Sequence, residues 1–187
     1  MLLSLGDYQL SIREFSTKSE QKIFLDNCKL NTIEIESDWA GEDRYYLIIC
    51  KHNNDDWAIE LTNSDTRDPI LLIDSKNLAL IIGLNNAIYF VDVSGKKIIS
   101  KIDITGDIIY QFHSLHHIGV SEFFIVDAEL SVFTLNFSGN RIWEYRADDI
   151  INYFELKDEH IIIKTMSSED KLYLNLYTGK PHQTNNS

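Results

Sequence analysis

One pattern of about ten residues occurs three times in this chain, and it limits the folds that the chain can adopt. Each copy holds a run of β-branched and aromatic residues, then an aspartate or asparagine, and a Ser-Gly or Thr-Gly pair near its end. This pattern predicts a β-strand that runs into a hairpin turn. The copies are residues 87–96, 131–140 and 171–180. Their glycines, Gly95, Gly139 and Gly179, lie 44 and 40 positions apart, which matches a repeat of four strands in about 40–45 residues.

Short strand-like runs continue around these copies and leave almost no room for helices beyond residue 43. The predicted strands are residues 44–50, 56–62, 70–73, 78–84, 87–93, 97–104, 107–113, 122–127, 131–137, 141–146, 149–155, 160–165 and 171–177. The N-terminal part differs, because residues 8–12 and 32–36 have strand character while residues 16–27 begin with residues that favour a helix N-cap. The sequence therefore predicts a mostly antiparallel all-β fold with one short helix near its N-terminus.

The repeated segments resemble the blades of β-propeller proteins, of the kind seen in quinoprotein-like and WD-like repeats. The resemblance covers residues 44–180 and implies a small propeller-like array of about four blades. A β-sandwich or meander with imperfect repeats is the alternative fold for the same strands. We expect one domain over residues 1–187. Within it, residues 1–43 form an atypical segment that can complete the last blade, and residues 181–187 form a tail.

The net charge of the chain limits the classes of partner that it can bind. The chain has 187 residues with 17 Lys+Arg against 29 Asp+Glu, a formal net charge of -12 and a pI of 4.8. Such a surface opposes binding to nucleic acids or anionic membranes and favours a basic protein partner. The longest apolar runs have strand length and no signal-peptide pattern opens the sequence, which predicts a cytoplasmic protein without a membrane span. Cys28 and Cys50 match no zinc or disulfide framework, and we interpret both as buried thiols.

The predicted blades also sort the charged loops, because successive loops of an antiparallel blade alternate between the two ends of its strands. One end then collects acidic and amide residues, whereas the other collects cations such as Lys96, Lys97 and Arg141. The predicted partner-binding residues at the acidic end are Asp55, Asp56, Trp57, Asp107, Glu129, Asp148, Asp149, Glu169 and Asp170. Trp39 and Trp57, beside predicted loops, are candidate interface anchors. The alternative is that these charges only keep the protein soluble.

Candidate catalytic and metal-binding residues are few. His113, His116 and His117 form an imidazole cluster of the type that binds zinc, but no second group of ligands lies near them in the sequence, so we predict no metal site. Adjacent acidic residues on a strand point to opposite faces and do not by themselves make a catalytic pair. No nucleophile elbow, phosphate loop or dinucleotide fingerprint occurs. We therefore predict no catalytic residue and no cofactor.

Three functions fit these features. The first is a non-enzymatic binding protein that neutralises a basic protein partner through its acidic loops. In general character, short, acidic and without a catalytic motif, the chain resembles bacterial immunity proteins, which implies inhibition of a toxin such as a nuclease. The second is a β-propeller scaffold or adaptor for protein–protein interaction, whose binding tolerates salt. The third is a small hydrolase or lyase with its site in a central pocket, where histidines and carboxylates with perturbed pKa values would converge.

Overall fold

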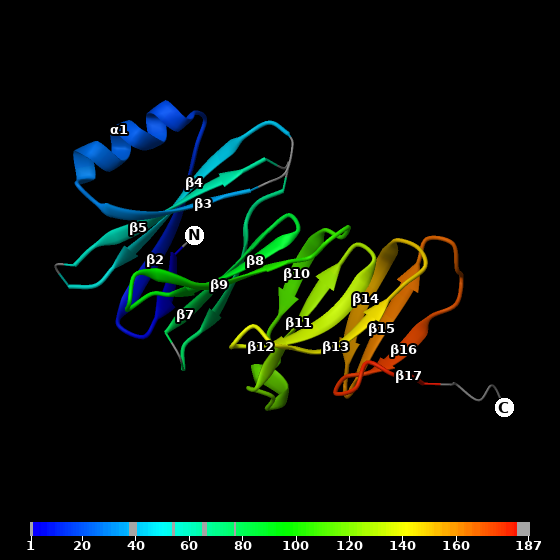
Figure 1. The fold of residues 1–187 in the computed structure, drawn as a ribbon. Helices are drawn as coiled ribbons and strands as arrows, with labels where there is room; N and C mark the ends of the chain where they lie inside the picture. The colour runs from blue at the N-terminus through cyan, green and yellow to red at the C-terminus, as the bar shows by residue number, and fades with distance from the viewer. Residues whose placement is uncertain (1, 38–40, 54, 65–66, 77, 183–187) are drawn as a thin grey trace. The chain divides into compact units, whose positions relative to one another are not determined.

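A computed structural model describes residues 2–37, 41–53, 55–64, 67–76 and 78–182, so Trp39 lies outside the described residues. Over these ranges the fold is nearly all-β, with four sheets and one α-helix, which confirms the predicted fold class. The expected domain over the whole chain consists of two compact units, Met1–Asp103 (unit 1) and Ile104–Ser187 (unit 2). Each unit contains two of the sheets and is described by itself (Figure 1).

The first sheet of unit 1 has five strands in the order β1-β2-β4-β5-β3. These strands are β1 (Leu2–Leu5), β2 (Tyr8–Phe15), β3 (Asn31–Glu36), β4 (Arg44–Lys51) and β5 (Trp57–Asn63). β3 runs parallel to β5, and the other pairs are antiparallel. The sequence allowed residues 1–43 to complete the last blade, but β2 and β3 instead pair with β4 and β5. Leu10 and Ile35 are buried in the core of unit 1, so this segment belongs to the first sheet.

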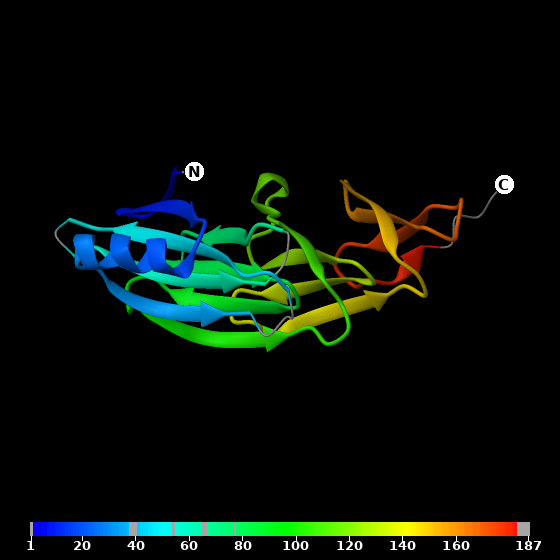
Figure 2. The same cartoon turned by 90° about the horizontal axis from the view of Figure 1, so that it is seen from above.

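Helix α1 (Lys18–Cys28) connects β2 to β3 and lies along one face of the first sheet (Figures 1 and 2). Thr17 caps its N-terminus, because the threonine hydroxyl accepts a hydrogen bond from a backbone N–H of the first turn. Leu25 packs against Leu47 of β4. The helix predicted over residues 16–27 is thus confirmed. Within the described ranges, no helix is long and apolar enough to cross a membrane.

The second sheet of unit 1 is an antiparallel meander of four strands, which is the topology of a propeller blade. Its strands are β6 (Ile70–Asp74), β7 (Ala79–Leu84), β8 (Ala87–Asp92) and β9 (Lys97–Asp103). β7 is buried along its whole length. Leu80 and Val91 of this sheet share one apolar core with Trp57 and Ile59 of the first sheet. The two central strands are continuous apolar runs in the sequence because both of their faces are covered.

Unit 2 contains two more antiparallel meanders, which lie side by side in Figure 1. The third sheet has β10 (Ile109–His113), β11 (Phe123–Ala128), β12 (Ser131–Asn136) and β13 (Arg141–Arg146). The fourth sheet has β14 (Ile151–Lys157), β15 (His160–Thr165), β16 (Leu172–Asn175) and β17 (Pro181–His182). A short 3-10 turn, η1 (His116–Ile118), lies between β10 and β11. Since β17 pairs with β16, residues 181–182 supply the fourth strand, and they are not part of a tail.

The aspartate or asparagine of the repeated pattern closes the hairpin after the third strand of each blade. Asp92 Oδ1 accepts a hydrogen bond from the backbone N–H of Gly95 (2.8 Å), and this bond holds the pKa of Asp92 below its usual range. Asn136 Oδ1 accepts in the same way from the backbone N–H of Asn140 (2.8 Å). Asn175 bonds to its own turn. The threefold repeat therefore reports turn geometry and identifies no ligand site.

Trp143 of β13 joins the third and fourth sheets in the core of unit 2. Its side chain is 8% exposed and belongs to one apolar cluster with Val132 of β12 and Leu174 of β16. Its Nε1–H donates a hydrogen bond to the carbonyl of Leu176 (2.9 Å). Gly179, with φ +66°, lies against the indole, so that a Cβ at this position would overlap the ring. The turn glycine of the third repeat is thus required by both its backbone and its neighbour.

The two cysteines lie in different environments. Cys50 of β4 is fully buried, and burial raises its pKa to about 12. Cys28, the last residue of α1, is exposed. The prediction of two buried thiols is therefore wrong for Cys28, because it lies at a helix end that the sheet does not cover.

We expect the folded chain to take up a single carbamidomethyl group from iodoacetamide at about pH 8, because only an accessible thiolate reacts quickly. The group should map to Cys28, whereas Cys50 should react only in denaturant. Mass spectrometry of the intact chain counts the additions. Two fast additions to the native protein would contradict the burial of Cys50.

Candidate functional site

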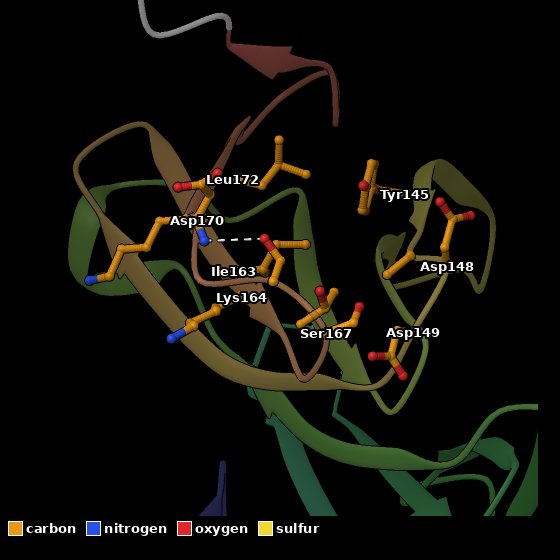
Figure 3. A pocket seen from close by; sticks show the side chains of 12 residues that line it. Tyr145, Asp148, Asp149, Ile163, Lys164, Ser167, Asp170 and Leu172 are labelled. Carbon is orange, nitrogen blue, oxygen red and sulfur yellow. Dashed lines mark hydrogen bonds between the residues drawn. The ribbon is translucent and has the colours of Figure 1, made fainter. Parts of the chain in front are cut away.

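A pocket of about 340 Å³ opens in unit 2, where the corner between β13 and β14 faces the turn between β15 and β16. Figure 3 shows one wall with Tyr145, Asp148 and Asp149, and the other with Ile163, Asp170 and Leu172. The remaining lining residues are Ala147, Lys164, Thr165, Ser167, Ser168 and Lys171. We refer to this site as the acidic pocket.

Strand geometry explains the apolar part of the acidic pocket. Trp143 and Tyr145 lie two positions apart on β13 and therefore point to the same face of the sheet. On the other wall, Ile163 of β15 pairs directly with Leu172 of β16. Burial, together with the charge of Asp148, raises the pKa of Tyr145, so its phenol stays neutral at physiological pH. The pocket thus has an apolar surface that includes one aromatic ring.

Three carboxylates border the acidic pocket. Asp148 and Asp149 lie between β13 and β14, and Asp170 precedes β16. Asp149 Oδ1 accepts a hydrogen bond from the backbone N–H of Ile150 (2.8 Å). This bond, followed by hydrogen bonds with Ser167, lowers the pKa of Asp149, which keeps its charge in mildly acidic solution. Among the residues that the structure describes, none of the three carboxylates forms an ion pair.

The two lysines of the acidic pocket have other partners. Lys164 Nζ lies 3.1 Å from the carboxylate of Glu169, and its side chain points away from the opposite wall in Figure 3. Lys171 Nζ lies 4.5 Å from the centre of the Tyr153 ring, and its hydrogen bond with the Tyr153 hydroxyl raises the pKa of Lys171. These lysines therefore leave the charge of the three aspartates available to a ligand.

The arrangement suits a cationic side chain better than acid–base chemistry. Carboxylates form strong, charge-assisted hydrogen bonds with ammonium and guanidinium groups, while Tyr145 and Leu172 offer apolar surface to a methylene stem. A general acid at neutral pH needs a raised pKa, whereas that of Asp149 is lowered. The geometry therefore favours binding over catalysis.

The predicted partner-binding residues of unit 1 lie outside this pocket. Asp55 forms an ion pair with Lys96, although their loops were expected at opposite ends of the strands. That expectation is wrong, because the hairpin of β4 and β5 belongs to a five-stranded sheet that does not follow the loop order of a blade. Asp56 is half-buried. Trp57 is 1% exposed in the core and presents no surface anchor.

Two further predicted residues of unit 2, Asp107 and Glu129, lie outside the acidic pocket. Asp107 is 2% exposed, and its Oδ1 accepts hydrogen bonds from the backbone N–H groups of Ile108 (2.9 Å) and Leu130 (2.8 Å). Its Oδ2 accepts from the hydroxyl of Ser131. Asp107 is therefore closed to a partner, contrary to the prediction, because it ties the start of β10 to the turn between β11 and β12. Glu129, in the same turn, bonds through its backbone to the carbonyl of Ile108.

The predicted histidine cluster is divided between two environments. The His113 ring at the end of β10 stacks on Phe154 with 4.2 Å between the ring centres. His116 and His117 lie in η1. No group of three or more His, Cys, Asp or Glu side chains in the described part of the chain is arranged to hold a metal ion.

Sequence reasoning identified Asp148, Asp149 and Asp170 but missed the apolar residues beside them. The signal for these residues was present in the repeat. Once the third copy is read as a strand, its preceding strand pairs with it in antiparallel register, which places Ile163 opposite Leu172. This pairing predicts one wall of the pocket. It does not predict how far that wall lies from the other sheet.

No known protein family and no curated protein sequence matches this chain. Its fold is similar to that of propeller-like solved structures. BamB from Moraxella catarrhalis is 12% identical with a TM-score of 0.49, covering 76% of this chain and 45% of that one. A structure of BBS1N in complex with ARL6DN is 10% identical with a TM-score of 0.49, covering 76% and 48%. Sqt1 from Saccharomyces cerevisiae is 13% identical with a TM-score of 0.44, covering 67% and 39%. The chain spans less than half of each of these structures, and such distant likenesses assign no function.

Proposed function

We propose that this chain is a non-enzymatic protein-interaction module that binds a basic segment of a partner protein in the acidic pocket. The main support is that Asp148, Asp149 and Asp170 line one pocket, and that none of them forms an ion pair with another described residue. A lysine or arginine side chain entering the pocket would pair with these carboxylates and cover Tyr145 with its stem. The net charge of -12 would also speed the encounter with a basic partner.

Two kinds of partner fit this proposal. The narrower hypothesis is a bacterial toxin, such as a nuclease with a basic cleft, for which the chain would act as a cytoplasmic immunity protein. The acidic charge supports it. The broader hypothesis is a scaffold or adaptor, and the blade-like sheets favour it because rigid β-scaffolds commonly present recognition loops at their ends. The activity of the captured partner distinguishes the two.

Replacing Asp148, Asp149 and Asp170 together with asparagine should weaken partner binding at least about tenfold, since three carboxylates at the surface lose their pairing with, and their attraction for, a cationic partner. The wild-type chain is used to capture proteins from its native host at low salt, with elution by rising salt and identification by mass spectrometry. The Kd of the purified partner is then measured against the wild-type and variant chains.

A matched control removes the same number of charges elsewhere in unit 2. The substitutions Glu122→Gln, Asp158→Asn and Glu159→Gln change exposed residues outside the acidic pocket. Equal weakening by both triple variants would show that net charge alone matters, and unchanged binding by the pocket variant would reject the pocket. Salt-tolerant binding would count against the acidic pocket for either partner, whereas loss of a nuclease activity on binding would favour the immunity protein over the adaptor.

A further inference from the structure

A second pocket of about 310 Å³ lies in unit 2 between β10, β11 and β14, and it shares no lining residue with the acidic pocket. Three aromatic side chains, one amide and one carboxylate line it. Two isoleucines also line it, the first residue of β14 and the residue before it. The chemistry-bearing residues are Tyr110, Asp127, Asn152, Tyr153 and Phe154. We refer to it as the aromatic pocket.

Two equivalent β-bulges form the aromatic pocket. The pairing of β10 with β11 slips at Tyr110, and that of β14 with β15 slips at Asn152. The sequence around both sites is itself repeated, since residues 107–112 align with residues 149–154. Bulges re-aim side chains and occur often beside functional sites. Here both bulged residues line the same pocket.

Asp127 is the unusual member of the aromatic pocket. It is 8% exposed, and its Oδ1 is buried without a hydrogen-bond partner. His113 Nε2 lies 3.9 Å from Asp127 Oδ2, beyond hydrogen-bond distance, and is itself without a hydrogen-bond partner. The equivalent residue of the fourth sheet is Lys164, which pairs with Tyr153 as Asp127 pairs with Gln111. The blade fold therefore does not require a carboxylate at this position.

A buried carboxylate oxygen without a donor is unfavourable, so the Asp127 carboxylate gains from a group that donates hydrogen bonds to it. The aromatic rings around Asp127 indicate which chemical class of ligand would donate these hydrogen bonds. Tyr110 and Tyr153 are 38% and 36% exposed, so part of each ring faces solvent. Phe154 is held in place by its stack on His113. Lys171 Nζ lies 4.5 Å from the centre of the Tyr153 ring, so this ring already contacts a cation.

We propose that the aromatic pocket binds the guanidinium group of an arginine, with hydrogen bonds to Asp127 and stacking on the tyrosine rings. A guanidinium is planar and stacks on aromatic faces, and it presents paired N–H donors that match a carboxylate. A quaternary ammonium group lacks N–H donors and could form no hydrogen bond with the Asp127 carboxylate. An ammonium group lacks the planar face. The site is distinct from the acidic pocket and does not depend on its role.

The test is a titration of the full chain with N-acetyl-arginine methylamide and with free arginine, followed by amide NMR shifts. Shifts should centre on β10, β11 and β14. At β10 and β11, which line only the aromatic pocket, N-acetyl-lysine methylamide and tetramethylammonium should bind at least about tenfold more weakly. Tetramethylammonium binding as tightly as the arginine probes, or no saturable shift with either of them, would overturn the proposal. Tighter binding of the capped or of the free form identifies a peptide or a small-molecule source.

Two variants assign the contacts. Asp127→Asn should weaken arginine binding at least about tenfold while leaving the thermal midpoint unchanged or higher, because it removes a buried carboxylate whose Oδ1 has no hydrogen-bond donor. Tyr110→Ala, which truncates a partly exposed ring, should also weaken binding without unfolding the chain. Glu159→Gln, an exposed change outside both pockets, should leave the arginine-induced shifts of β10 and β11 unchanged. Because β10 and β11 do not line the acidic pocket, their shifts separate failure here from failure of the proposed function. Wild-type affinity in a folded Asp127→Asn or Tyr110→Ala variant would reject the site.

Discussion

The substitution Trp143→Ala should lower the free energy of unfolding of unit 2 by about 3–5 kcal/mol, the usual cost of removing a buried tryptophan. The indole is 8% exposed and contacts residues of both sheets of this unit. Its loss also leaves the carbonyl of Leu176 without the donor that now lies 2.9 Å away. Hydrogen exchange followed by mass spectrometry measures the effect, and peptides from residues 104–182 should lose protection.

The neighbouring residue gives a matched control for Trp143. Ile142 is 48% exposed on the same strand, so Ile142→Ala should change the protection of unit 2 very little. Gly179→Ala should be harmful in the wild-type chain, because the new Cβ would overlap the indole. It should be less harmful when combined with Trp143→Ala, which removes that clash. If Trp143→Ala and Ile142→Ala behave alike, the indole does not hold the two sheets together.

The blade-like sheets could be predicted because their signals are local. Each hairpin is set by a few neighbouring residues, such as Asn136, whose side chain accepts a hydrogen bond from the backbone of its own turn. Consecutive strands of an antiparallel meander then pair without further information. For this reason the strand predicted over residues 141–146 agrees with β13 at both ends.

Pairing between distant segments could not be predicted in the same way. The parallel pairing of β3 with β5 joins Ile33 to Ile59, and no turn specifies it. The hydrophobic pattern shows only that β3 has a buried side. Because the first sheet is assembled from such pairings, the loop rule failed there and Asp55 meets Lys96. In unit 2, where each sheet is an antiparallel meander of consecutive strands, the same rule placed Asp148 and Asp170 at one end, and both line the acidic pocket.

The burial of individual acidic side chains was the other property that could not be predicted from the sequence. Asp107 and Asp149 occupy equivalent positions in the two repeats of unit 2, and each accepts a hydrogen bond from the backbone N–H of the next residue. The difference lies in their surroundings. Ser131 and the turn between β11 and β12 enclose Asp107, whereas Asp149 lines an open pocket. A predicted interface residue thus became a structural one through contacts that lie more than twenty positions away.

Substituting these two equivalent aspartates should have different effects on stability. Asp107→Ala should lower the free energy of unfolding of unit 2 by at least about 3 kcal/mol, since each buried donor left unsatisfied costs about 1–3 kcal/mol. The donors are the backbone N–H groups of Ile108 and Leu130 and the hydroxyl of Ser131. Urea unfolding followed by circular dichroism measures the change, with hydrogen exchange assigning it to unit 2.

Asp149→Ala should have the opposite profile, with a small effect on unfolding and a clear loss of partner binding. Its carboxylate lines an open pocket, so water can replace it as the acceptor for the N–H of Ile150. Asp107→Ala, at a temperature where it remains folded, should bind the partner normally, because its carboxylate never reaches the surface. Loss of binding in folded Asp107→Ala together with normal binding in Asp149→Ala would reverse the two roles and place the interface away from the acidic pocket.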